Sequence, residues 1–121
     1  MSRFAGIIID CRSDDLDAAV AFWSAALGFP RRPNAEPRYV TLDTPGDEPH
    51  VEVQKVDHES RVHIDIESDD IPAEVARLEA LGARRVADIR DWCVMEAPTG
   101  QRFCVVPAIR PDFAAKANRW P

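Results

Sequence analysis

The chain contains an internal repeat, which limits the possible folds more strongly than any other feature of the sequence. Residues 8–16 (IIDCRSDDL) align without a gap with residues 63–71 (HIDIESDDI). Downstream, residues 26–28 and 80–82 share the sequence ALG after a slip of one residue. A repeat of this kind predicts a fold built from two copies of one supersecondary unit.

The second copy shows which structure the repeat encodes. Residues 61–67 alternate apolar and polar side chains, which predicts a strand whose polar face carries His63. Ser68 or Asp69 can cap the helix that follows. The first copy predicts the same strand and helix, with Ile8 at the position of His63.

Each predicted helix is followed by three extended segments, at residues 29–32, 38–43 and 49–56 in the first copy and at 84–87, 91–96 and 101–106 in the second. The sequence therefore predicts an α+β fold in a single domain of 121 residues. It has two βαβββ modules, residues 1–57 and 61–107, and a tail, residues 108–121, that Phe113 and Trp120 predict to pack on the body. A sheet covered by a helix on one face leaves its other face bare. Two such modules can pair into a mixed sheet and curl their bare faces into one cup.

Period-two alternation selects the side chains that face the predicted cup. They combine aromatic, carboxylate, amide, thiol and imidazole groups, a mixture typical of a small-molecule site. The candidate residues are Asp10, Tyr39, Glu52, Gln54, His63, Asp65, Trp92 and Cys104. Two structural alternatives stay open. In one, His63 serves only to hydrogen-bond Glu52 or Asp65; in the other, Cys104 is no more than a small buried side chain.

Composition argues against several kinds of partner. The net charge of −6 and the scattered basic residues argue against a nucleic-acid partner and an anionic membrane surface. No apolar run is long enough to span a bilayer, and the first residues lack a basic-then-apolar signal. Three cysteines cannot form a paired framework, and they indicate reduced thiols in a cytoplasmic protein.

Several motifs resemble the vicinal oxygen chelate superfamily, which includes glyoxalase I, extradiol dioxygenases, fosfomycin-resistance transferases and bleomycin-binding proteins. The resemblance covers nearly the whole chain and is strongest to the glyoxalase-like branch. The motifs are Asp15-Leu16, Ala21-Phe22-Trp23, Leu27-Gly28-Phe29, His63-Ile64-Asp65, Asp69-Asp70, residues 78–83 (LEALGA) and residues 98–103 (PTGQRF). The resemblance implies the two-module fold but no single reaction, because this fold hosts many chemistries.

The resemblance also implies positions for a metal ion. Metal-using members hold the ion with one residue on the first strand and one on the last strand of each module, usually His or Gln on the first and Glu on the last. In this sequence the positions are Ile8, Glu52, His63 and Cys104. Glu52 and His63 suit a divalent ion such as zinc, nickel, manganese or iron, whereas Ile8 has no donor atom and a Cys104 thiolate suits zinc. The expected metal site is therefore degenerate.

Three functions fit these residues. The first is a protein that binds a small molecule in the cup and has a degenerate metal site. The second is a divalent-metal-dependent lyase, isomerase or dioxygenase-type enzyme, in which Glu52 and His63 are the catalytic and metal-binding residues. The third is an antibiotic-sequestering protein of the bleomycin-resistance type, with Tyr39 and Trp92 stacking on the ligand. The resemblance also implies a homodimer, and His50 and His58 are expected at the surface.

Overall fold

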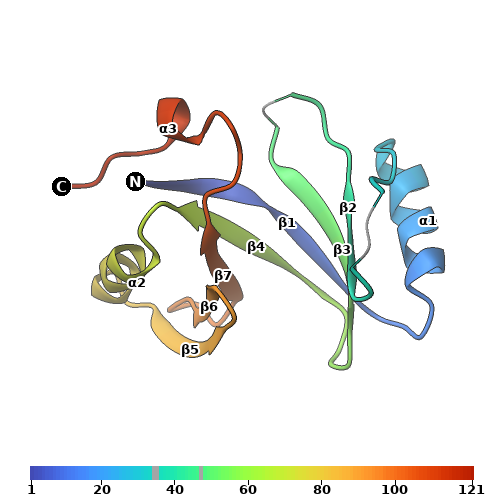
Figure 1. Cartoon of the computed structure of the whole chain (residues 1–121). Coiled ribbons are helices and arrows are strands. Elements are labelled where there is room, and N and C mark those ends of the chain that lie inside the picture. Colours follow the sequence, from blue (N-terminus) through green and yellow to red (C-terminus); the bar gives the residue numbers. More distant parts are fainter. Residues whose placement is uncertain (34–35, 47) are drawn as a thin grey trace. The chain divides into compact units, whose positions relative to one another are not determined.

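The computed structural model describes residues 1–33, 36–46 and 48–121. The described residues form seven strands and three helices, so the predicted α+β class is confirmed. They divide into two compact units (Figure 1). One unit is Gly6–His63, and the other combines Met1–Ala5 with Ile64–Pro121. Each unit is described below by itself.

The unit Gly6–His63 contains most of strand β1 (Ser2–Arg12), helix α1 (Leu16–Leu27), β2 (Tyr39–Leu42) and β3 (His50–Val56). Strand β3 pairs in parallel with β1 and antiparallel with β2. Helix α1 packs against β2 and β3. The core between them consists of Ile9, Val20, Val40, Leu42, Val51 and Val53. Apolar burial on this face leaves the opposite face of the strands without a helix from this unit.

The other unit contains most of β4 (Arg61–Ser68), then α2 (Ile71–Ala80), β5 (Arg84–Ile89), β6 (Trp92–Glu96), β7 (Arg102–Pro107) and α3 (Phe113–Lys116). Its strands lie in the order β4-β7-β6-β5, with β4 and β7 parallel and the remaining neighbours antiparallel. Helix α2 packs against β5, β6 and β7. The core of this unit consists of Val75, Leu78, Cys93, Met95, Phe103 and Val105.

Helices α1 and α2 begin with the same kind of N-terminal cap. The Asp15 carboxylate accepts a hydrogen bond from the backbone N–H of Ala18, and the Asp70 carboxylate accepts one from Ala73, at 3.0 Å in both. In each copy, the serine two residues earlier accepts a bond from the aspartate N–H. The second helix is therefore capped one residue later than the predicted Asp69. The identical caps show that the sequence repeat is also a structural repeat at these positions.

The first copy lacks one predicted strand. Residues 29–32 form only an isolated bridge between Arg31 and Leu42, supported by a 2.7 Å bond from the Asp43 N–H to the Pro30 carbonyl. Proline has no N–H to donate, and this limits strand pairing at such a segment. The first copy is therefore βαββ, whereas the second has the full βαβββ order.

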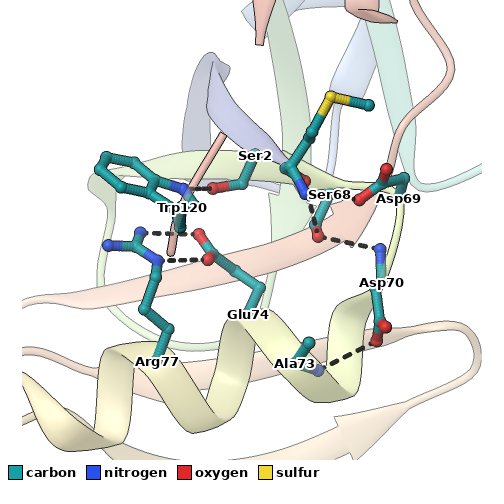
Figure 2. A network of polar contacts seen from close by, with 9 residues as sticks. Ser2, Ser68, Asp69, Asp70, Ala73, Glu74, Arg77 and Trp120 are labelled. Atoms are coloured by element: carbon teal, nitrogen blue, oxygen red, sulfur yellow. Dashed lines mark hydrogen bonds and ion pairs between the residues drawn. The ribbon is translucent and has the colours of Figure 1, made fainter. Parts of the chain in front are cut away.

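The C-terminal tail packs on its own unit, as predicted (Figure 2). Phe113 is buried, and the indole N–H of Trp120 donates to the Ser2 hydroxyl at 2.8 Å. The Arg77 guanidinium lies 4.0 Å from the centre of the Trp120 ring and donates two hydrogen bonds, of 2.6 and 2.9 Å, to buried Glu74. Strand β1, helix α2 and the tail are thus joined through one network of polar and cation–π contacts.

A second network joins the start of β1 to the tail. Arg3 donates hydrogen bonds of 2.6 Å to Glu67 and to Asp112, and the Asp112 bond raises the pKa of Arg3 above its ordinary value. Glu67 is 1% exposed, and Arg110 approaches it within 3.5 Å. Removing one member would leave a buried charge without its partner, which is costly. In the described part of the chain, no helix has the length and apolar character needed to cross a membrane.

Candidate functional site

The helix-free face of Gly6–His63 carries most of the predicted site residues. Strand register places Asp10, Gln54 and Tyr39 side by side across β1, β3 and β2. A second row, two residues along, consists of Ile8, Glu52 and Thr41. We call these six residues the polar rows, since all of them except Ile8 have a polar side chain. They lie opposite the apolar core because side chains alternate along each strand.

His63 is held at this face by Asp10. The His63 Nδ1 atom lies 2.8 Å from Asp10 Oδ2. Asp10 is 2% exposed, and its other oxygen, Oδ1, has no hydrogen-bond partner among the described residues. The Arg61 Nε atom lies 3.6 Å from Asp10 Oδ2, and His58 Nε2 lies 4.0 Å away. The predicted surface position of His58 is confirmed, since its side chain is 44% exposed.

Glu52 lies near a different histidine. Its Oε1 atom is 4.0 Å from His50 Nε2, and the His50 side chain is only 17% exposed. The prediction that His50 lies at the surface is therefore wrong. The cause is close packing, because a Cβ atom at Gly6 would overlap the His50 carbonyl oxygen and part of its ring. Only glycine lets the backbones of β1 and β3 approach in this way.

The strand register corrects one correspondence between the two copies. Asp10 pairs with Gln54, and its repeat counterpart Asp65 pairs with Cys104. Gln54 is therefore the counterpart of Cys104, and the predicted counterpart, Glu52, lies two residues too early. A shift of two residues keeps a side chain on the same face of a strand, so alternation could not detect it. Of the two side chains, Gln54 is thus the one at the register position of Cys104.

The other unit places three predicted site residues on its own helix-free face. Asp65 and Cys104 are partners in the β4–β7 register, and their ligand atoms lie within 4.8 Å of each other. Asp65 is 7% exposed, and Cys104 is partly exposed. Trp92, also partly exposed, lies at the start of β6, where it pairs with Ile89. Val94 pairs with Cys104 and adds an apolar surface beside the thiol.

The donor atoms of Gly6–His63 fit a divalent metal ion in part. His63 offers an imidazole nitrogen, and Gln54 and Glu52 offer oxygen atoms on the same strand face. A metal-binding histidine almost always donates its other ring N–H to a carboxylate, a carbonyl or a water, and Asp10 supplies such a carboxylate. Ile8 has no donor atom at its position. The set of donor atoms is thus incomplete, but the imidazole of His63 has the carboxylate partner that a metal-binding histidine usually has.

The pairing of Asp10 with His63 was missed from the sequence. The sequence predicts Asp10 as a candidate residue of the cup, but it offers only Glu52 or Asp65 as a hydrogen-bond partner of His63. The repeat carries the available signal. Asp65 has an imidazole two residues before it on its own strand, at His63, whereas Asp10 has Ile8 at that position. An imidazole beside Asp10 therefore has to come from another strand. Which neighbouring strand supplies the imidazole depends on pairing between strands, and a repeat does not specify this pairing.

A repeated α+β unit with a helix on one sheet face and a polar opposite face defines a chain of the vicinal oxygen chelate type. A sequence profile of the glyoxalase-like domain matches residues 6–106, and the chain belongs to this family. The predicted superfamily is therefore confirmed. Among curated protein sequences, none matches the chain.

Solved structures show the same fold. Methylmalonyl-CoA epimerase from Mycobacterium tuberculosis is 20% identical with a TM-score of 0.63, over 93% of this chain and 91% of the epimerase. The Mn(II)-bound glyoxalase from Novosphingobium aromaticivorans is 22% identical with a TM-score of 0.61, over 87% of this chain and 39% of that one. A trihydroxybiphenyl dioxygenase from Sphingomonas wittichii strain RW1 is 15% identical with a TM-score of 0.61, over 91% and 42%. These similarities establish the fold and leave the reaction open.

Proposed function

We propose that this protein binds a small, oxygen-rich organic molecule at the polar rows, with His63 as the principal contact. The observation that supports this function most strongly is the pairing of His63 with buried Asp10. A buried carboxylate fixes the imidazole at a polar, partly buried face, where a core histidine of purely structural use is less expected. Tyr39 and Gln54 add an aromatic surface and an amide next to Asp10.

The similar structures support this ligand class by their names. One is an epimerase of methylmalonyl-CoA and another a dioxygenase of a trihydroxybiphenyl, and both molecules carry closely spaced oxygen atoms. Antibiotic sequestration stays an alternative for the same face. Asp65, Trp92 and Cys104 stay predictions for ligand contact. The three free cysteines also lead us to infer a reducing, cytoplasmic location.

Thermal unfolding with candidate ligands tests this function. We expect methylmalonyl-CoA, a catechol or a related compound to raise the midpoint, because a ligand at about 100 times its Kd stabilises the folded state by about 2.7 kcal/mol. His63→Ala should abolish the shift. The matched control is His58→Ala, since His58 is exposed and lies 4.0 Å from the same carboxylate. A shift that persists in His63→Ala would place the ligand elsewhere.

A second candidate function is a divalent-metal-dependent enzyme. The Asp10–His63 contact favours it, because metal-binding histidines carry this support. His63 with an oxygen of Gln54 or Glu52 would hold the ion, which would act as a Lewis acid on vicinal oxygens of the substrate. Glu52, a carboxylate on the same face, would take up and return the proton of the reacting carbon.

Calorimetric titration of untagged protein with Zn²⁺, Ni²⁺ or Mn²⁺ tests this candidate. We expect stoichiometric binding that His63→Ala abolishes and His58→Ala leaves intact. Gln54→Ala tests the position that the strand register indicates for a metal ligand, and Glu52→Ala tests the position that the sequence predicts. Absence of binding at micromolar concentrations of the wild-type protein would remove the metal-dependent mechanism and leave metal-free binding.

A further inference from the structure

We propose that an open cavity at the end of strand β1 binds a free α-amino acid. The cavity is lined by Arg12, Ser13, Asp14, Val56 and Asp57, all in the unit Gly6–His63. Its volume is about 440 Å³, which is in the range of small-molecule sites. Asp14 and Asp57 bind the ammonium group of the ligand, and Ser13 and Arg12 bind its carboxylate. The polar rows contain none of these five residues, so the proposal goes beyond the proposed function.

The second copy of the repeat holds an amino-acid residue in the same manner. The ammonium group of Met1 donates a hydrogen bond of 2.8 Å to Asp69 Oδ1. The carbonyl oxygen of Met1 accepts bonds from the Ser68 hydroxyl, at 3.1 Å, and from the backbone N–H of Asp69, at 3.3 Å. A Ser-Asp pair just before a helix therefore binds both the ammonium and the carbonyl group of one residue.

The first copy has the same pair, since Ser13 and Asp14 are the repeat counterparts of Ser68 and Asp69. The serine accepts a backbone hydrogen bond from the cap residue in both copies. The Ser13 hydroxyl donates to the Asp15 carbonyl, at 3.3 Å, whereas the Ser68 hydroxyl donates to Met1. The first copy thus presents the hydroxyl and carboxylate groups of the pair to a cavity.

The charges around the cavity suit both ends of a free amino acid. Asp57 adds a second carboxylate beside that of Asp14, and Arg12 adds a guanidinium. At the position of Arg12, the second copy has Glu67, which is buried and bound to Arg3. Within the part of the chain that the structure describes, the side chains of Arg12, Asp14 and Asp57 form no ion pair. Carboxylates attract an ammonium group, and a guanidinium can bind a carboxylate with two hydrogen bonds.

NMR titration of the ¹⁵N-labelled full chain with L-methionine tests the proposal. Methionine is the probe because it is the residue that Ser68 and Asp69 hold. We expect saturable chemical-shift changes at millimolar concentration, confined to the amides of residues 12–14 and 56–57. N-acetyl-L-methionine, which has no ammonium group, should cause much smaller changes.

Substitutions separate the two ends of the ligand. Asp14→Asn should weaken the binding of L-methionine about tenfold, because it removes a charged acceptor at nearly constant size. Arg12→Gln should weaken the binding of L-methionine but not of L-methioninamide, which lacks the carboxylate. Asp91→Asn, at an exposed aspartate between β5 and β6, is the matched control and should leave both affinities unchanged.

Several results would overturn the proposal. These are the absence of saturable changes with L-methionine at high millimolar concentration, equal binding of N-acetyl-L-methionine, and equal affinity in the wild type and Asp14→Asn. Changes centred on the polar rows would place the amino acid elsewhere and would also overturn it. His63→Ala, which tests the proposed function, should leave the binding of L-methionine intact, so the two proposals fail independently.

Discussion

Asp15 and Asp70 cap helices α1 and α2 in the same way, at corresponding positions of the repeat. Asp15 and Asp70 each accept a 3.0 Å bond from the N–H three residues later. We therefore expect Asp15→Ala and Asp70→Ala to lower the free energy of unfolding by similar amounts, about 0.5–2 kcal/mol each. Urea denaturation measures both. Asp14→Ala, which removes a neighbouring exposed aspartate without a cap, is the matched control and should cost less than either.

The sequence predicts which face of a strand a residue occupies, but not which residue it pairs with, because side chains on one face repeat every two residues. In β3, Val51 and Val53 lie in the core, and Glu52 and Gln54 both point to the opposite face, so alternation cannot distinguish Glu52 from Gln54. The contact between Asp10 and His63 was also out of reach, since it joins two strands that a linear pattern does not pair. Facing directions are local properties, whereas register is set by pairing.

Secondary-structure elements were predicted better than their ends. The order of strands and helices in the second copy is as expected, because caps, alternation and turn residues agree there. In the first copy, residues 29–32 read as extended yet form one bridge, since Pro30 cannot donate to a ladder. The tail was assigned from Phe113 and Trp120, but its partners Ser2 and Arg77 appear only in the fold.

Glu74, a buried residue of helix α2, makes stability depend on pH through its contacts with Arg77 of the same helix and Ser2 of β1. Burial alone would raise the pKa of Glu74, but hydrogen bonds from Arg77 and Ser2 outweigh burial and lower it. A carboxyl with a lowered folded-state pKa stabilises the fold above its unfolded pKa of about 4.3. That stabilisation is lost as the pH falls through the lowered folded-state pKa.

Glu74→Gln should therefore be less stable than the wild type near neutral pH, by about 1.5–3 kcal/mol, the range for hydrogen bonds to charged groups. The difference should shrink as the pH is lowered well below 4. Urea denaturation at several pH values measures it. Glu79→Gln, at an exposed position of the same helix, is the control and should show little effect at any pH. A difference for Glu74→Gln that stays constant with pH would contradict the assigned ionised pair.

At the scale of the whole molecule, the prediction that needs a measurement in solution is the oligomeric state. Strand β2 lies at one end of the strand order in its unit, and β5 lies at one end in the other. Exposed strand edges are commonly covered by pairing or by association with another copy, and closed twofold dimers are the commonest oligomers. The resemblance to the superfamily points the same way, so we expect a homodimer. Multi-angle light scattering across a dilution series should give twice the mass of the chain at micromolar concentration. A monomer mass throughout the series would rule the homodimer out and would require the polar rows to bind their ligand within a single copy.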